Sequence, residues 1–244
     1  MVTAGAPPAA ATIERLEGEL GWEVTQVYGL TETGPFLTVC EPRPEHAQLA
    51  PAERAVIKAR QGVELVTSGE LRVVDSAGKE VPADGAAMGD IVYRGNVIMT
   101  GYFKDPEATE AVMGDGWFHT GDAAVTHPDG YVESRDRIKD VIISGGENIS
   151  SVEVEGVLLR HPAVQEAVIV GVPHPKWGEA PFAFIVLKPG AEAAPDDLIA
   201  FARERPAHFK APHGVAFVTE LPKTATGKIR KYVLRNGALA IVAQ

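Results

Sequence analysis

The sequence is poor in several features that would point to a specialised class of protein. It has one cysteine, Cys40, so no disulfide can form within the chain, and we predict that Cys40 is a small apolar core residue. No apolar run reaches the length of a membrane-spanning helix, and the N-terminal segment Met1–Ala11 lacks the basic lead-in of a signal peptide. These absences predict a cytoplasmic protein without a membrane span.

Basic residues are also in short supply. The chain has 23 Lys and Arg against 33 Asp and Glu, which gives a formal net charge of −10. Binding to nucleic acid needs a concentrated basic face, so we do not expect nucleic acid as a partner. The best local basic cluster runs from Lys223 to Lys231.

What the chain does have is enough apolar sequence for a sizeable core, with 45% hydrophobic residues in 244. Its first part is rich in Gly and Pro, with short strands and helices, whereas its second part alternates strand and helix in a β-α-β-β-α-β order typical of a small α+β domain. We predict domains at residues 1–138 and 139–244. The predicted strands are 70–75, 90–94, 140–143, 167–170, 181–187 and 215–218. The predicted helices are 12–20 with Thr12 as N-cap, 53–60, one after Ser150 with Glu153 completing a capping box, one from Asp196 or Asp197 to 203, and one from Lys231.

The segment Tyr28–Thr33 (YGLTET) is the first candidate site. An apolar run, Trp22–Val27, leads into it, which predicts a strand that ends in a tight turn. The turn presents an aromatic ring that can stack on a base, a hydroxyl that can donate to a phosphate and a carboxylate that can hold Mg²⁺. Taken alone, an ordinary strand end with a capped turn explains it as well.

Four further segments have the same ambiguity. Asp122 in GWFHTGD follows a glycine at a predicted strand end, where a carboxylate can accept both ribose hydroxyls or simply form a turn. The alternating charges of Arg135–Asp140 and the paired glycines of Ser144–Asn148 suit a linker and a close backbone approach to a ligand. Lys228 lies on a small, hydroxyl-rich loop, Pro222–Arg230, from which it could reach a phosphate.

Together and in this order, these motifs resemble the AMP-forming acyl-CoA synthetases of the adenylate-forming superfamily. The resemblance also includes Gly5-Ala6-Pro7 and GDIVYRGNVIMTGY (Gly89–Tyr102), and it extends over essentially the whole chain. It implies the C-terminal portion of the large AMP-binding domain, with a β-barrel-like subdomain, followed by the small mobile C-terminal domain. Three segments are most similar in sequence to those of synthetases for short- and medium-chain or aryl acids: GGENISSVEVE, GVPHPKWGE and ELPKTATGKIRKYVLR.

The resemblance implies a role for each matching residue. Gly5, Ala6, Pro7, Tyr28 and Gly29 would frame the adenine, Thr31 would contact phosphate, Glu32 would hold Mg²⁺, Asp122 would bind the ribose, and Arg137 would complete the nucleotide site. Lys228 would act in adenylation, Lys139 would be the hinge, and Gly145 and Gly146 would approach the pantetheine arm of coenzyme A. The implied reactants are a fatty or aryl carboxylic acid, ATP (released as AMP) and coenzyme A, with Mg²⁺.

One departure from the family leaves alternatives open. The Ser/Thr/Gly-rich phosphate loop that precedes the YGLTE motif in the family is absent, since only 27 residues precede Tyr28. We therefore expect a C-terminal half whose first domain pairs with its missing N-terminal half or self-associates through exposed strand edges. A non-catalytic nucleotide- or coenzyme A-binding remnant is the first alternative. An enzyme that loads a carrier protein is the second, although no carrier segment follows Gln244.

Overall fold

The computed structural model describes residues 1–5, 8–204, 210–225 and 227–242. The chain divides into two compact units, Met1–Ser134 and Arg135–Gln244, which are taken separately below. The predicted domain boundary between residues 138 and 139 lies a few residues beyond this division, and it stays a prediction about the functional domains. Within the described ranges, no helix is long and apolar enough to cross a membrane.

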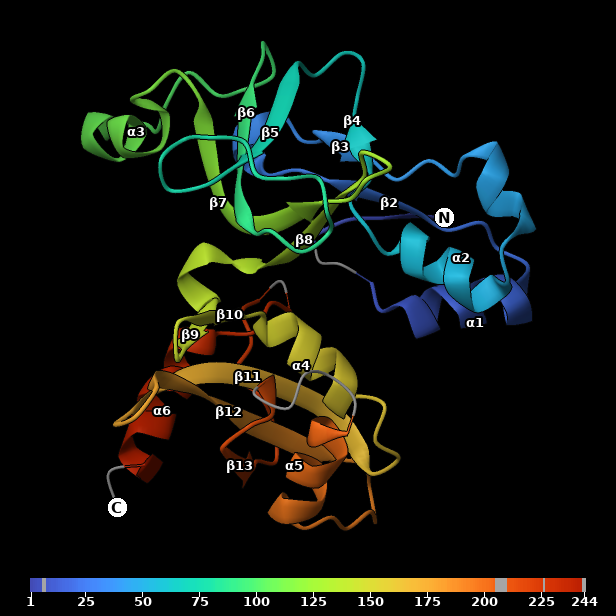
Figure 1. The fold of residues 1–244 in the computed structure, drawn as a ribbon, viewed down its shortest axis with the longest axis vertical. Helices are drawn as coiled ribbons and strands as arrows, with labels where there is room; N and C mark the ends of the chain where they lie inside the picture. The colour runs from blue at the N-terminus through green and yellow to red at the C-terminus, as the bar shows by residue number, and fades with distance from the viewer. Residues whose placement is uncertain (6–7, 205–209, 226, 243–244) are drawn as a thin grey trace. The chain divides into compact units, whose positions relative to one another are not determined.

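The first unit begins with a four-stranded sheet in the order β1-β2-β3-β4 (Figure 1). β1 and β2 are parallel, whereas β3 pairs antiparallel with both β2 and β4. Helices α1 and α2 pack together around Ile13 and Ala55. The strands are β1 (Val2–Thr3), β2 (Thr25–Tyr28), β3 (Thr38–Val39) and β4 (Val63–Glu64). The helices are α1 (Ala10–Leu20) and α2 (Pro51–Lys58), with short 3₁₀ turns η1 (Thr31–Thr33) and η2 (Pro44–Gln48).

A second sheet follows in the order β5-β6-β7-β8, made of β5 (Glu70–Val74), β6 (Gly89–Arg94), β7 (Phe118–Thr126) and β8 (Val132–Arg137). Helix α3 (Pro106–Met113) lies between β6 and β7 in the chain. Val73, Ile91, Ala124 and Val132 form the core of this part. In the described residues no sheet closes into a barrel, so the expected barrel-like subdomain is an open sheet. Four strands are too few to curl round and pair at both ends.

The second unit is one sheet with helices on both faces (Figure 1). Alternate residues of β11 point to opposite sides, so Ala167 and Ile169 pack against α4 and α5, while Val168 and Val170 pack against α6. The strand order is β10-β9-β12-β11, with β13 paired to β12. The elements are η3 (Ile138–Asp140), β9 (Ile142–Ser144), β10 (Glu147–Ile149), α4 (Ser151–Leu158), β11 (Val164–His174), β12 (Gly178–Leu187), α5 (Pro195–Arg203), β13 (Gly214–Phe217) and α6 (Lys231–Val242).

The mixed α/β class predicted from the sequence is confirmed, but two local predictions are wrong. Helix α1 begins at Ala10 with Ala9 at its N-cap and no side-chain cap, because the alanines before Thr12 are themselves strong helix formers. Asp140 belongs to the turn η3 rather than to a strand, which starts at Ile142. The Ser150 cap is confirmed, since its Oγ accepts from the Glu153 N–H at 3.1 Å.

Candidate functional site

The YGLTET segment forms the predicted strand end and turn. β2 ends at Tyr28, and a side chain at Gly29 would collide with the Pro35 carbonyl oxygen, 2.0 Å from its Cβ position. The buried Thr33 Oγ accepts from the Leu30 N–H at 2.8 Å and donates to the Leu30 carbonyl at 3.0 Å. Thr33 therefore fixes the turn, and Thr31 is left exposed to solvent.

Glu32, the implied metal ligand, is half-buried beside Tyr102. The Tyr102 hydroxyl donates to Glu32 Oε1 at 3.0 Å, and the Met99 N–H donates to the Glu32 carbonyl at 2.8 Å. Among the described residues, no three His, Cys, Asp or Glu side chains gather closely enough to hold a metal by themselves. Mg²⁺ commonly binds through one carboxylate together with substrate phosphates and waters, so a single oriented carboxylate fits that ion.

Tyr28 and Asp122 meet although 94 residues separate them. The Tyr28 hydroxyl donates to Asp122 Oδ2 at 2.8 Å, and the Asp122 side chain is largely buried. Asp122 lies inside β7 and not at a strand end, so that part of the prediction is wrong. The pairing with β6 is irregular between Asp90 and Val92, and Gly121 has φ +70° opposite this irregularity. The irregularity leaves three residues of β7, Thr120–Asp122, opposite one residue of β6 and redirects the side chains beside it, while Asp122 itself stays buried.

A pair of charged side chains supports this bulge. Asp90 Oδ1 accepts from the Gly121 N–H at 3.1 Å, and its Oδ2 lies 2.7 Å from His119 Nδ1. The other ring nitrogen of His119 lies 3.1 Å from Asp115 Oδ2. Burial raises the pKa of the Asp90 carboxyl, and the adjacent His119 offsets this only in part.

The segment that contains Gly5 follows β1, which runs parallel to β2, so Gly5 and Gly29 come after the carboxyl ends of two adjacent parallel strands. Carboxyl ends of parallel strands share one edge of a sheet, where ligands commonly bind. Ala6 and Pro7 lie outside the described residues. Gly5, Tyr28, Gly29 and Asp122 are thus all in the first unit.

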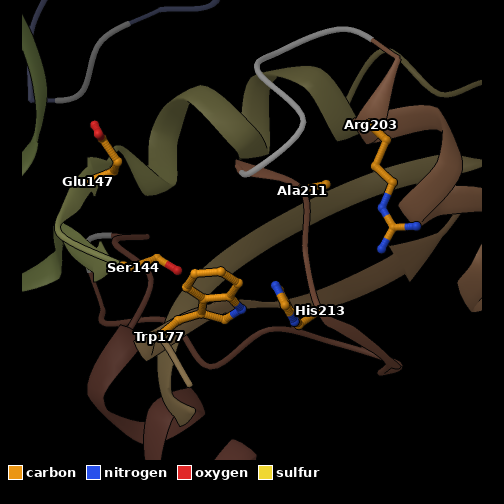
Figure 2. A pocket seen from close by; sticks show the side chains of 7 residues that line it. Ser144, Glu147, Trp177, Arg203, Ala211 and His213 are labelled. Carbon is orange, nitrogen blue, oxygen red and sulfur yellow. The ribbon is translucent and has the colours of Figure 1, made fainter. Parts of the chain in front are cut away.

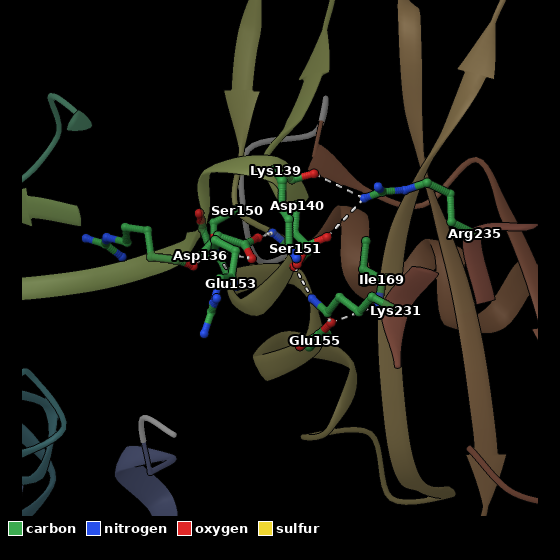
Figure 3. Close-up of polar contacts among 12 residues, drawn as sticks. Asp136, Lys139, Asp140, Ser150, Ser151, Glu153, Glu155, Ile169, Lys231 and Arg235 are labelled. Atoms are coloured by element: carbon green, nitrogen blue, oxygen red, sulfur yellow. Dashed lines mark hydrogen bonds and ion pairs between the residues drawn. The ribbon is translucent and has the colours of Figure 1, made fainter. Parts of the chain in front are cut away.

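The predicted hinge segment, residues 136–140, belongs to the second unit and is held by hydrogen bonds at both ends (Figure 3). Asp136 Oδ2 accepts from the Ser151 N–H at 2.7 Å, at the start of α4. Arg235 Nη2 donates to Asp140 Oδ1 at 3.1 Å and to the Lys139 carbonyl at 3.3 Å. Between these fastenings, the Arg137 and Lys139 side chains are exposed.

Gly145 and Gly146 form the turn between β9 and β10, beside a pocket of about 520 Å³ (Figure 2). The Gly145 N–H donates to the Trp177 carbonyl at 2.8 Å. Trp177 is 39% exposed, and its ring stacks on His174 with centroids 6.5 Å apart. Partial burial, followed by the charges of His174 and Arg203, lowers the pKa of His213. The pocket is lined by Ser144, Gly145, Glu147, Trp177, Arg203, Ala211 and His213.

Lys228 is exposed on a loop whose backbone is closed on itself. The Thr224 N–H donates to the Lys228 carbonyl at 2.7 Å, and the Lys228 N–H donates to Thr224 Oγ at 3.1 Å. An isolated bridge between Lys223 and Ile229 narrows the base of the loop. The loop thus presents a lysine ammonium to solvent from a defined backbone position.

Two family models match parts of the chain. The AMP-binding enzyme family matches residues 1–103, and the AMP-binding enzyme C-terminal domain matches residues 153–228. The chain belongs to the AMP-binding enzyme family. The match to the AMP-binding enzyme family comes first in the chain and the match to the C-terminal domain comes second.

Individual relatives of this chain are named as CoA ligases or acyl-activating enzymes. The probable acyl-activating enzyme 4 of Arabidopsis thaliana is 48% identical over 244 residues, which cover 99% of this chain and 45% of that protein. The peroxisomal acetate/butyrate–CoA ligase AAE7 of the same plant is 48% identical over 98% of this chain and 42% of its own length. The ATP-bound crystal structure of MatB from Rhodopseudomonas palustris has a TM-score of 0.84 at 32% identity, over 98% of this chain and 45% of that one. The chain therefore spans about half the length of the curated relatives it matches.

Several residues of the candidate site were not predicted from the sequence. Tyr102 holds Glu32, Asp90 and His119 support the bulge beside Asp122, and Trp177 walls the pocket at Gly145. Tyr102 lies in the motif Gly89–Tyr102 and His119 lies in GWFHTGD. The sequence alone does not tell which carboxylate either side chain contacts. Trp177 follows a proline and a lysine in a loop. An aromatic residue in a loop is only a weak sequence signal for a ligand-binding role.

Proposed function

We propose that the protein carrying this chain activates a carboxylic acid with ATP and transfers the acyl group to coenzyme A. The observation that carries the proposal is the hydrogen bond between Tyr28 and Asp122, because it joins two separate motifs that the family uses for adenine and ribose. Family membership and the names of the relatives support the same chemistry. Since the chain spans about half of those relatives, the activity belongs to the proposal.

In the first step, an oxygen of the substrate carboxylate attacks the α-phosphorus of ATP, and pyrophosphate leaves. Charge grows on the phosphoryl oxygens, so the protein's contribution is to position the reactants and to stabilise that charge. Tyr28 and Asp122 would hold the nucleoside, and Thr31 and Arg137 would contact phosphate or ribose oxygens. Lys228 would supply a compact positive charge to the reacting phosphate.

Glu32 would hold Mg²⁺ together with the nucleotide phosphates. When bound, the ion would neutralise part of the charge on the departing pyrophosphate. Tyr102 would keep one oxygen of Glu32 in a hydrogen bond, which leaves the other oxygen of the carboxylate for the metal or its waters.

In the second step, the thiol of coenzyme A attacks the acyl carbonyl and AMP leaves. The pocket beside Gly145 supports this step, because an indole face, Arg203 and His213 suit the adenine ring and phosphates of coenzyme A. Lys176 Nζ lies 4.3 Å from the centroid of the Trp177 ring and adds to the positive charge there. Lys139 would be the hinge about which the small domain turns between the two steps.

The substrate class that we propose is a short- or medium-chain fatty acid or an aryl acid. The proposal rests on the motif wording and on relatives named for acetate and butyrate. We propose a cytoplasmic location, although three relatives are named as peroxisomal. Fluorescent tagging of the full-length protein checks this, and signal confined to peroxisomes would contradict it.

Acid-dependent exchange of labelled pyrophosphate into ATP tests the adenylation step. We expect exchange with the full-length protein in the presence of butyrate or benzoate and Mg²⁺, followed by acyl-CoA formation when coenzyme A is added. Nucleotide binding without exchange would favour the non-catalytic remnant. Exchange followed by transfer only to a phosphopantetheinyl carrier would favour the carrier-loading enzyme.

Replacement of Lys228 by alanine separates the two steps. We expect Lys228→Ala to lower the adenylation rate by about 100- to 1,000-fold, as loss of a charge aimed at a transition state does. Thioester formation from supplied acyl-adenylate should change little. Equal loss of both half-reactions would contradict the assignment of Lys228.

A further inference from the structure

The loop that carries Lys228 is anchored by ion pairs at both of its ends. At the first end, Lys223 Nζ lies 2.6 Å from Glu166 Oε2, a pair that is more than a third exposed on the lysine side. At the second end, Lys231 Nζ lies 2.8 Å from Glu155 Oε1, and both side chains are about 15% exposed. The second pair is the more buried, so it is less screened by water and salt and holds its geometry more strictly.

Lys231 and Glu155 come from helices on opposite faces of the sheet. Glu155 is on α4 and Lys231 begins α6, and the two meet beside β11 (Figure 3). β11 is the last strand in the sheet order, so in the described part of the chain its outer edge has no strand beside it. Glu155 Oε1 accepts a hydrogen bond from the Ile169 N–H at 2.9 Å, on the outer edge of β11. The carboxylate thus satisfies an edge amide and a lysine at once.

The same cluster continues toward the predicted hinge. Lys231 Nζ also donates to Ser151 Oγ, and the backbone N–H of Ser151 donates to Asp136 in the hinge segment. Arg235 follows Lys231 by one helical turn, so the two side chains leave α6 on the same face. Arg235 is the residue that binds Asp140 and the Lys139 carbonyl. A single face of α6 therefore fastens the base of the Lys228 loop and the hinge segment to α4.

We propose that Lys231 is a positioning residue for Lys228: its buried pair with Glu155 fixes the base of the loop, and with Arg235 it makes loop, hinge segment and α4 one rigid body. The proposal rests on the proposed function, because it assigns the effect to adenylation. A lysine that must meet the phosphate after a domain movement needs a base that does not flex. The Lys231–Glu155 pair provides this base three residues after Lys228.

The test uses the full-length protein and three variants. Lys231→Met alone leaves Glu155 as an unpaired buried carboxylate and can unfold the domain, so the main variant is the double substitution Glu155→Gln/Lys231→Met, which removes both charges. Lys231→Arg keeps the charge and tests rescue. Lys188→Met makes the same change at a lysine outside the loop, whose Nζ donates to the Pro162 carbonyl at 2.7 Å.

For the folded double variant, we expect adenylation to fall by about 10-fold or more through kcat, with KM for ATP and acid nearly unchanged. Thioester formation from supplied acyl-adenylate should fall by less than about threefold, and Lys231→Arg and Lys188→Met should stay near wild type. Unchanged adenylation in the folded double variant, or an equal fall in both half-reactions, would overturn the proposal.

Hydrogen exchange gives a readout that does not depend on activity. The N–H groups of Thr224, Gly227 and Arg230 are hydrogen-bonded within the loop or its base, and they should exchange faster in the double variant than in Lys188→Met. Unchanged exchange would overturn the anchoring role. If wild-type protein shows no acid-dependent pyrophosphate exchange while the loop amides respond as expected, the proposed function fails and the anchoring role stands.

Discussion

At the scale of single residues, the charge of His119 depends on the two carboxylates that flank its ring. Partial burial disfavours the charged ring, but hydrogen bonds to Asp115 and Asp90 and the charges of both outweigh it, and they raise the pKa of His119. A group whose pKa is higher in the folded than in the unfolded protein stabilises the fold below its ordinary pKa, 6.5 for His119, and that stability is lost as pH rises through the raised value.

Replacement of His119 by glutamine should therefore destabilise the protein more at pH 6 than at pH 9. We expect a loss of about 1 kcal/mol at pH 6, reduced from the usual value for a charged hydrogen bond because the ring is partly exposed, and a smaller loss at pH 9. Chemical denaturation of both proteins at the two pH values measures the difference. A loss that is the same at both pH values would show that charge on His119 does not matter.

The meeting of Tyr28 and Asp122 was predictable, because both match motifs that imply binding of one nucleoside. The two side chains lie within hydrogen-bonding distance, and their role in binding a nucleoside stays a prediction. Their supports were not predictable, because Asp90 meets His119 and Gly121 only through the pairing of β6 with β7. A linear sequence gives the type of each side chain but not the register that brings two strands together.

At the scale of secondary-structure elements, the turn between β9 and β10 has little room on one side. Gly145 has φ +62°, and a Cβ there would lie 2.9 Å from Cε3 of Trp177. Gly146 has φ +89°, and nothing lies within 4 Å of its Cβ position. Both glycines thus adopt a left-handed backbone conformation that other residues disfavour, but only Gly145 packs against the Trp177 side chain that lines the pocket.

Alanine at these two positions should separate backbone strain from displacement of Trp177. Each substitution should cost about 1–2 kcal/mol of stability because L residues disfavour this conformation. Gly145→Ala should also push the indole aside and raise KM for coenzyme A by about 10-fold more than Gly146→Ala does. Denaturation curves and acyl-CoA kinetics measure the two effects, and equal KM values for the two variants would argue against a role for Trp177 in the pocket.

Elements were predictable where local chemistry decides them. Ser150 caps α4 as predicted, and β5 and β6 lie within one or two residues of their predicted ranges. The capping box was only half right, because Glu153 reaches Lys210, with Nζ–Oε2 2.7 Å, instead of turning back to the cap. β11 runs further than the predicted strand 167–170, since pairing with β12 extends it from Val164 to His174. In both cases a distant partner overrides a local preference.

At the scale of the whole chain, each unit has apolar clusters of its own. In the second unit, the two faces of the sheet are covered by separate clusters, one with α4 and α5 and one with α6. Fully buried side chains such as Ile169, Ile185 and Leu158 lie in the first of these clusters. A domain of this size with two covered faces can bury enough surface to fold by itself.

Residues 135–244 produced alone should therefore fold cooperatively. We expect a single urea transition with an unfolding free energy of about 5 kcal/mol or more, within the usual range for small domains. Circular dichroism and tryptophan fluorescence should give coincident transitions. A non-cooperative transition, or strong binding of a hydrophobic dye, would mean that this unit depends on the first one.

The bulge at Gly121 has a consequence for how this family tolerates insertions and deletions. Side chains alternate along a strand, so an extra residue shifts the alternation for every residue after it. Removing Gly121 would exchange the two faces of Ala123–Val125, which are buried, and would also take Asp122 out of its place beside Tyr28. Deletion of one residue here should therefore disrupt both the core packing and the candidate site. Selection should therefore preserve the length of β7 more strictly than the identity of most of its residues.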